Sequence, residues 1–296
     1  MRRILGAVTM LLAAVAGMTA CDSGATSGGP GQITVLLTDA PFPFDSVKSA
    51  HIYIVRIDAK QAATTDVEAE DASNGGWTTL ASPNSAIDLL ALDNGVTLNL
   101  GTATVPSGTW ESFRVVIDPS QSYVTLKDDS RPDIKWPSAG QSGIKILLAE
   151  PVVVASNLST MVVDFDVGAS FVLRGNSIRN NGLLFKPVVH AVATDISASF
   201  SGTVRGDSPT GAPIANATVE LLKPGTLLTD TDAANVLRST ATDANGAFSF
   251  SFVLPGSYAV RVTPPSGSAY KAALLSGGLT LTNQQVSTGT VIVLAK

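Results

Sequence analysis

The sequence predicts an all-β fold, with two β-sandwich domains that follow an N-terminal export signal and a flexible tether. From residue 32 onward the apolar residues occur in short runs rich in Val, Ile, Thr and Phe, which favour strands. Gly, Pro, Asn and Asp separate these runs, as is typical of turns between strands. A length of 296 residues is too great for one sandwich of about 100 residues and suits two domains.

Composition and charge exclude several classes of function. The chain is 45% hydrophobic and 15% charged, which is typical of a globular protein with a buried core. Its net charge is −5, and removal of an export signal that contains Arg2 and Arg3 makes it more negative. Nucleic-acid binding needs a basic surface that follows the phosphates, so we expect no nucleic-acid partner.

Residues 1–20 have the features of a signal peptide. Arg2 and Arg3 form a short positive segment, and an apolar stretch over residues 4–17 follows it. About 20 apolar residues are needed to span a bilayer as a helix, so this stretch is too short to be a membrane-spanning anchor. The chain's single cysteine, Cys21, comes directly after this segment.

Residues 18–21, with the sequence MTAC, resemble a lipobox, the site that lipoprotein signal peptidase cleaves. The resemblance implies that residues 1–20 are removed and that Cys21 is acylated, which would anchor the protein to a bacterial membrane, facing the periplasm or the cell surface. The alternative is an ordinary signal peptide cleaved after Ala20. Residues 21–31 are rich in Gly and Ser and are expected to form a flexible, lipidated tether. Whether the membrane is the inner or the outer one stays open.

The first domain is expected over residues 32–195, and strand-like segments occur along most of its length. Residues 51–58 show the pattern clearly, because both faces of the alternation carry apolar residues, which places this strand inside a sandwich. Residues 86–92 are spaced for one or two helical turns that end before Gly95. Further strands are expected at residues 33–37, 96–100, 110–117, 144–148, 152–155, 161–167, 170–173 and 183–193.

The second domain is expected over residues 196–296, where the strands shorten and Gly, Thr and Ser increase. The sequence DANG before residue 247 predicts a hairpin between strands at 239–242 and 247–252, with Gly246 at positive φ. Strict alternation places three aromatic residues on one face of the second strand, namely Phe248, Phe250 and Phe252.

This second domain resembles the carboxypeptidase-regulatory-like family. The segments GTV, PIANATV, TDANGAF and LPGSY, which begin at residues 202, 213, 242 and 254, follow the order of that family. The resemblance implies a transthyretin-like sandwich of seven strands. It also implies a spacer or a support for binding, since fold alone does not define an activity.

The first domain resembles the lipoprotein family called Domain of unknown function (DUF4382). Its matching segments include TDAP, GWTTL, IDLL, PSGTW, VDFD and LFKP, which begin at residues 38, 76, 87, 106, 163 and 184. The family has no assigned chemistry, so the resemblance implies a fold and no activity.

Few residues of the sequence suit catalysis or metal binding. There is no G-x-S-x-G segment, and Cys21 is assigned to the lipid. The two histidines, His51 and His190, are far apart among apolar strand residues, so we interpret both as structural and expect no zinc site. We therefore expect no enzyme, no catalytic residue and no cofactor.

Three aspartates remain as candidates for a metal or catalytic site. Asp164 and Asp166 are two positions apart on an expected strand, so both should point to one side, and Asp39 lies at a proline-rich turn. Such carboxylates could hold Ca²⁺ or hydrolyse a glycan. In the structural alternative, Asp39 caps a turn while Asp164 and Asp166 lie at a solvated or hydrogen-bonded edge, with backbone N–H groups, Arg174 or Lys186 as partners.

Two classes of function stay open. The first is a non-enzymatic binding or structural module of the cell envelope that binds a polysaccharide or an envelope protein, with calcium-dependent surface adhesion as a variant. The second is a glycan hydrolase that uses Asp164 or Asp166. Trp77, Trp110 and Trp136 would suit a sugar-stacking face, but they lie in three separate segments and are interpreted as packing residues.

Overall fold

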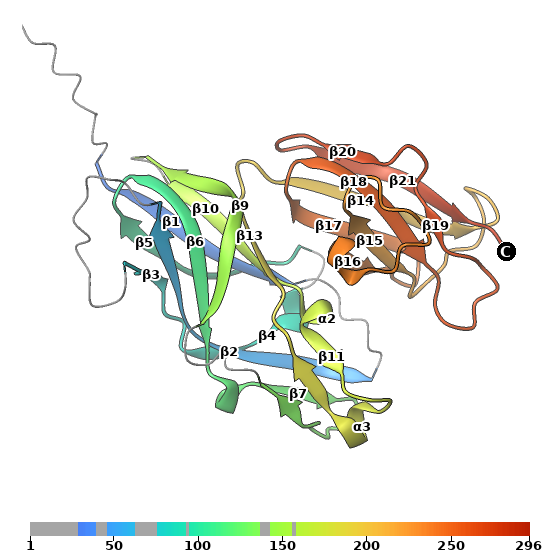
Figure 1. Cartoon of the computed structure of the whole chain (residues 1–296), viewed down its shortest axis with the longest axis horizontal. Helices are drawn as coiled ribbons and strands as arrows, with labels where there is room; N and C mark the ends of the chain where they lie inside the picture. Colours follow the sequence, from blue (N-terminus) through green and yellow to red (C-terminus); the bar gives the residue numbers. More distant parts are fainter. Residues whose placement is uncertain (1–28, 40–45, 63–75, 93–94, 137–142, 156–157) are drawn as a thin grey trace, which may run out of the picture.

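A computed structural model describes residues 29–39, 46–62, 76–92, 95–136, 143–155 and 158–296. It confirms the all-β prediction: the described chain forms several sheets and only short helices (Figure 1). The predicted signal peptide and Cys21 lie outside the described residues. In the described part, no helix is long and apolar enough to cross a lipid bilayer.

The N-terminal unit, β1 to β13, contains a four-stranded sheet in the order β13-β10-β1-β5. Strand β1 pairs in parallel with β10 and antiparallel with β5. Its fully buried apolar residues, Ile33, Val35 and Leu37, alternate along the strand and share one face, whereas Leu36 on the other face is partly buried. The bounds are β1 (Gly31–Asp39), β5 (Leu98–Val105), β10 (Leu158–Phe165) and β13 (Val189–Ala193).

A second sheet of this unit has the order β3-β2-β6-β9, with β4 and β7 also paired to β2. Residues 144–148 and 152–155, expected as two strands, form the single strand β9. Pro151 is tolerated there because β9 is an edge strand of this sheet. The bounds are β2 (Val47–Gln61), β3 (Thr78–Ala81), β4 (Ser85–Asp88), β6 (Gly108–Ile117), β7 (Tyr123–Leu126) and β9 (Ile144–Val154).

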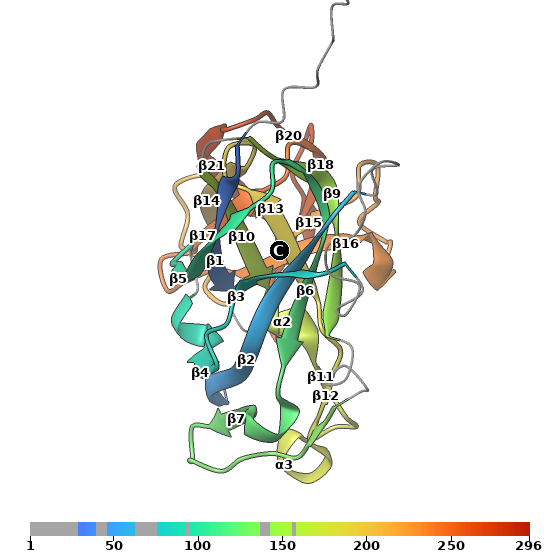
Figure 2. The same ribbon diagram turned by 90° about the vertical axis from the view of Figure 1, so that its left-hand side faces the viewer.

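One core fills this unit. Strand β9 lies beside β13 and β3 beside β5, so the two sheets approach each other at both edges (Figure 2). The core reaches from these sheets to the small third sheet, β11-β12-β8. The largest fully buried side chains come from all three sheets and include Trp110, Phe113, Phe165, Phe171 and Phe185. The bounds of the third sheet are β8 (Ile134–Lys135), β11 (Phe171–Leu173) and β12 (Leu183–Phe185).

Several expected boundaries differ in the structure. The strand expected over 183–193 is divided into β12 and β13 around Pro187, and residues 86–92 form β4 followed by the 3₁₀ helix Leu89–Leu92. The strand expected over 161–167 ends at Phe165, where α2 (Val167–Ser170) begins after its cap. The other short helices among the described residues are α3 (Ile178–Asn181) and the 3₁₀ turns Pro119–Gln121 and Ala233–Asn235.

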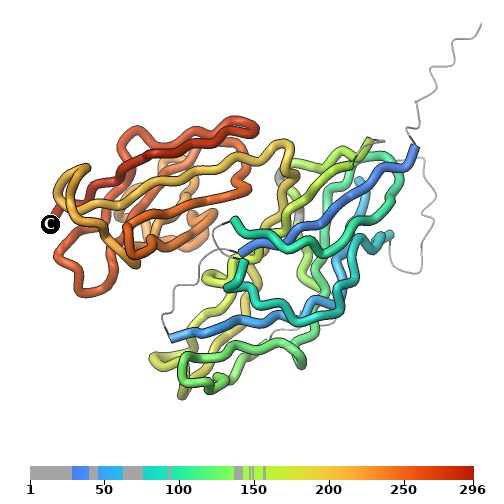
Figure 3. Tube along the Cα trace, turned by 180° about the vertical axis from the view of Figure 1, so that it is seen from behind, coloured from blue at the N-terminus to red at the C-terminus, as the bar shows by residue number. Residues whose placement is uncertain are grey.

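The C-terminal unit, β14 to β21, is a sandwich with a core of its own. One sheet has the order β17-β14-β21; the other has the order β16-β15-β18-β19, with β20 also paired to β18. Figure 3 follows the chain from β13 into β14, where it passes from one unit to the other. The bounds are β14 (Ala198–Gly206), β15 (Thr218–Leu222), β16 (Val236–Ala241), β17 (Ala247–Val253), β18 (Gly256–Thr263), β19 (Ala273–Leu274), β20 (Leu279–Leu281) and β21 (Val286–Leu294).

The β16–β17 hairpin has the predicted turn, with Gly246 at φ 72°. The prediction that three phenylalanines share one face is wrong for Phe252. Phe248 and Phe250 are buried, but Phe252 has φ 56°, which interrupts the alternation and places Val253 in the core instead. This interruption lies where the C-terminal unit meets the N-terminal unit.

Candidate functional site

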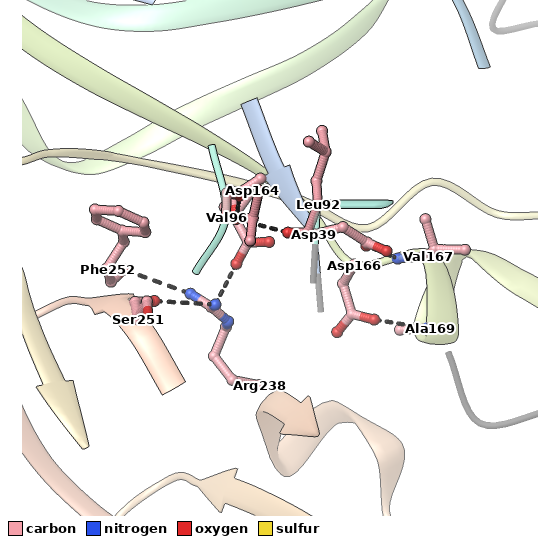
Figure 4. Close-up of polar contacts among 11 residues, drawn as sticks. Asp39, Leu92, Val96, Asp164, Asp166, Val167, Ala169, Arg238, Ser251 and Phe252 are labelled. Carbon is pink, nitrogen blue, oxygen red and sulfur yellow. Dashed lines mark hydrogen bonds and ion pairs between the residues drawn. The ribbon is translucent and has the colours of Figure 1, made fainter. Parts of the chain in front are cut away.

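Asp164 lies at the end of β10 and is only 1% exposed. It is paired across the sheet with His190 of β13 and lies next to Thr38 of β1. Its carboxylate forms an ion pair with the guanidinium of Arg238, which belongs to β16 of the C-terminal unit (Figure 4). A buried charge of the N-terminal unit is therefore neutralised by the other unit.

Arg238 also makes hydrogen bonds within the C-terminal unit. Its two terminal nitrogens donate to the carbonyl oxygens of Ser251 and Phe252 at 3.4 and 3.5 Å. Only 12% of the Arg238 side chain is exposed. The close approach of the units is clear at Gly95, where a Cβ would lie 2.5 Å from the Ser251 hydroxyl. We call Asp39, Asp164, Asp166, His190 and Arg238 the junction.

Asp166 and Asp39 each accept a hydrogen bond from the start of α2. Asp166 is the N-cap, and its Oδ1 accepts from the Ala169 N–H at 2.8 Å. Asp39 Oδ1 accepts from the Val167 N–H at 2.9 Å, which connects the end of β1 to α2. The expectation that Asp164 and Asp166 lie on one strand and point to one side is wrong, because β10 ends between them.

The partner expected for Asp164 is also wrong. Arg174 forms its ion pair with Asp133 at 2.8 Å, and Arg238 takes the place that Arg174 or Lys186 was expected to have. Sequence reasoning missed Arg238, which is a single cation in a short strand 74 positions away. In the sequence, Arg238 is marked only by being a charged residue within the strand-like segment VLRSTA.

Burial dominates the electrostatics of the junction. It raises the pKa of Asp166 to about 6; the nearby charge of Asp164 acts in the same direction, while the Ala169 N–H and Arg238 oppose it. Burial lowers the pKa of His190, Arg238 lowers it further, and Asp164 opposes this. His190 is therefore neutral at pH 7, as a structural histidine would be.

The junction is closed to large substrates. Asp164 and Asp166 are 1% and 2% exposed, and Asp39 is 4% exposed. Across the described ranges, no group of three or more His, Cys, Asp or Glu side chains is arranged to hold a metal ion. The calcium site at Asp39, Asp164 and Asp166 stays a prediction, and the contacts present are those of a structural joint.

The other candidates from the sequence lie apart from the junction. His51 stacks on Tyr123 with ring centroids 4.6 Å apart. Trp110 is buried in the core, and the Trp136 ring packs 4.6 Å from that of Phe185. Trp77 lies under the Arg114 guanidinium at 4.6 Å. With Trp110 buried, these tryptophans do not form a shared exposed face.

The family pattern described as Domain of unknown function (DUF4382) matches residues 30–187. This chain belongs to that family. A second pattern, Carboxypeptidase regulatory-like domain, matches residues 199–294. Both resemblances seen in the sequence are thus confirmed. The DUF4382 region supplies Asp39, Asp164 and Asp166 to the junction, and the carboxypeptidase-regulatory-like region supplies Arg238.

Solved structures similar to this DUF4382 chain include the TIE protein of Bacillus anthracis, at 10% identity over 90% of this chain and 34% of that one, with a TM-score of 0.26. A streptococcal ancillary pilin matches at 13% identity over 90% and 62%, with a TM-score of 0.25. A Pseudomonas aeruginosa protein proposed to bind carbohydrate matches at 20% identity over 35% and 90%, with a TM-score of 0.22. The chain spans about a third of the length of the first protein and less than two thirds of the length of the second. No curated protein matches the sequence.

Proposed function

We propose that this protein is a bacterial lipoprotein, anchored through Cys21, that acts as a non-enzymatic binding or structural module of the cell envelope. The observation that carries the proposal is the ion pair between Asp164 and Arg238. The carboxylate that a hydrolase would need is buried and joins the two units instead. The anchor rests on residues 18–21, and the partner is a polysaccharide or a protein of the envelope.

The junction favours a rigid arrangement of the two units. A buried ion pair is costly to break, since removal of one partner leaves an uncompensated charge, at about 3–5 kcal/mol. Arg238 is additionally directed by the carbonyl groups of Ser251 and Phe252. A joint of this kind holds the second unit in one orientation, which suits a protein that presents a surface at a fixed distance from the membrane.

The burial of Asp164 and Asp166 is an argument against the hydrolase alternative. A raised pKa is what a general acid needs, and Asp166 has one. In Asp166 burial causes the rise in pKa. A glycan hydrolase also needs the glycan and an attacking water to reach both carboxyl groups. With exposures of 1% and 2%, neither carboxyl group is accessible to a glycan polymer.

Three experiments test the proposal. Metabolic labelling with palmitate should label the native protein and should fail for Cys21→Ser. A panel of glycan and ester substrates should show no turnover by residues 22–296, whereas a glycan array or an envelope pull-down should show binding. Turnover that Asp164→Asn abolishes without a change in melting temperature would contradict the non-enzymatic role, and absence of palmitate would contradict the anchor.

A further inference from the structure

A second charged cluster lies on the sheet β3-β2-β6-β9, away from the junction. Thr79, Asp58, Arg114 and Lys145 are successive cross-strand partners on β3, β2, β6 and β9. Directly paired residues share one face of a sheet, so these four form a row across it. Figure 2 shows the last three of these strands side by side.

Asp58 organises this row. Its carboxylate is fully buried and accepts hydrogen bonds from the Arg56 Nε at 3.1 Å, the Arg114 Nε at 2.9 Å and the Thr79 hydroxyl at 2.8 Å. The Arg114 Nη2 adds a further contact at 2.5 Å. Arg114 also lies over the Trp77 ring at 4.6 Å. One carboxylate therefore fixes two guanidinium groups on the same face.

The cluster has unused positive charge. Asp58 binds Arg56 through Nε alone, and within the described ranges no hydrogen bond is made by the two terminal nitrogens of Arg56, whose side chain is 35% exposed. Lys60, two positions from Asp58 on the same strand face, and Lys145 are exposed. Arg56, Lys60 and Lys145 thus present positive charge on this face, although the net charge of the chain is −5.

We propose that this face is a binding site for a carboxylate-bearing polysaccharide, with Arg56, Lys60 and Lys145 as its cationic contacts. The planar fork of a guanidinium matches a carboxylate, and a guanidinium that is already oriented loses less entropy on binding. Arg56 and Lys60 lie along β2 on either side of Asp58, and Lys145 lies two strands away on β9, so the cations are spread over the sheet face, which suits an extended polymer. The choice of a glycan over a nucleic acid rests on the proposed envelope location.

Residues 22–296 would be titrated with polygalacturonate, with neutral dextran and a DNA duplex as comparisons. We expect polygalacturonate to bind, with an affinity that falls as salt rises, and dextran not to bind. Arg56→Gln should weaken binding about tenfold, the factor that corresponds to loss of one charge-assisted hydrogen-bond pair of about 1.4 kcal/mol. Lys145→Gln should weaken it by a smaller factor.

Lys48→Gln is the matched control, because Lys48 is an exposed cation on the same strand whose charge is already paired with Asp129 at 2.6 Å. It should bind like the wild type, and Lys48→Gln and Lys145→Gln should melt at the wild-type temperature. If the melting temperature of Arg56→Gln is lower than that of the wild type, the affinities of Arg56→Lys and Lys145→Gln for polygalacturonate decide whether this face is the binding site. Equal losses for Lys48→Gln and Arg56→Gln, no loss for either, or tighter binding of the duplex would overturn the proposal. Palmitate labelling and the absence of turnover would be unaffected by such a result, so the two proposals can fail separately.

Discussion

At the scale of single residues, Asp166 shows how burial and capping compete. Its carboxylate caps α2, which favours the charged form, yet burial raises its pKa to about 6. Between pH 3.8 and about 6 the folded state therefore holds a proton that the unfolded state has released. The free energy of unfolding contributed by this group is highest below the unfolded pKa and falls as the pH rises through that interval.

This difference predicts the behaviour of Asp166→Asn. The amide keeps the cap and cannot ionise, so the variant should be more stable than the wild type at pH 7, by up to about 3 kcal/mol, and equal to it near pH 4. Urea unfolding at both pH values measures this. The comparison cancels the opposite contribution of His190, which is present in both proteins. An equal gain at both pH values would show that Asp166 does not titrate in this range.

The sequence singled out Asp39, Asp164 and Asp166, which are buried in the structure, but it could not define their contacts. The segment VDFDVGAS reads as a strand through residue 167, whereas Asp166 followed by small residues is also an N-cap pattern, and tertiary contacts decided between the two. Arg238 could not be predicted as the partner of Asp164, because a contact between residues 74 positions apart depends on how the two units meet.

At the scale of elements, turns were easier to predict than strand ends. The hairpin at Gly246 follows from local chemistry, since a positive φ next to Asn is favoured by glycine. The division of residues 183–193 at Pro187 also has a local signal, but two strands in one apolar run look continuous in the alternation pattern. Phe252 was misplaced because a positive φ in a phenylalanine has no sequence signal.

Two glycines in the C-terminal unit allow the cost of a left-handed backbone to be measured separately from the cost of a steric clash. Gly225 and Gly246 have φ values of 80° and 72°, but a Cβ on Gly225 meets nothing within 4 Å, while one on Gly246 lies 2.5 Å from the Val204 carbonyl oxygen. Gly225→Ala should cost about 1 kcal/mol for the left-handed backbone. Gly246→Ala should cost clearly more, as measured by urea unfolding, and equal losses would show that the turn relaxes away from β14.

At the scale of the whole molecule, the two units have separate cores and share a buried ion pair. The sequence predicted an all-β chain of two parts from the change in strand length and from the two family resemblances. It could not predict that the parts are joined, because the ion pair seen between them in the described part of the chain, Asp164–Arg238, depends on how two separately folded sheets meet. The domain limits at 32–195 and 196–296 stay predictions.

The distance between the two units is the most direct test of the proposal that this protein is a rigid module with a structural Asp164. A chain of residues 22–296 has no cysteine, so Thr104→Cys on β5 and Thr280→Cys on β20, both exposed, provide one spin label in each unit. Arg261→Ala is the matched control, because Arg261 is also 12% exposed and ion-paired, but with Glu220 inside the C-terminal unit. Pulsed electron spin resonance should give one narrow distance distribution for the wild type and for Arg261→Ala, and a broad or shifted one for Arg238→Ala. An equally narrow, unshifted distribution for Arg238→Ala would contradict the account.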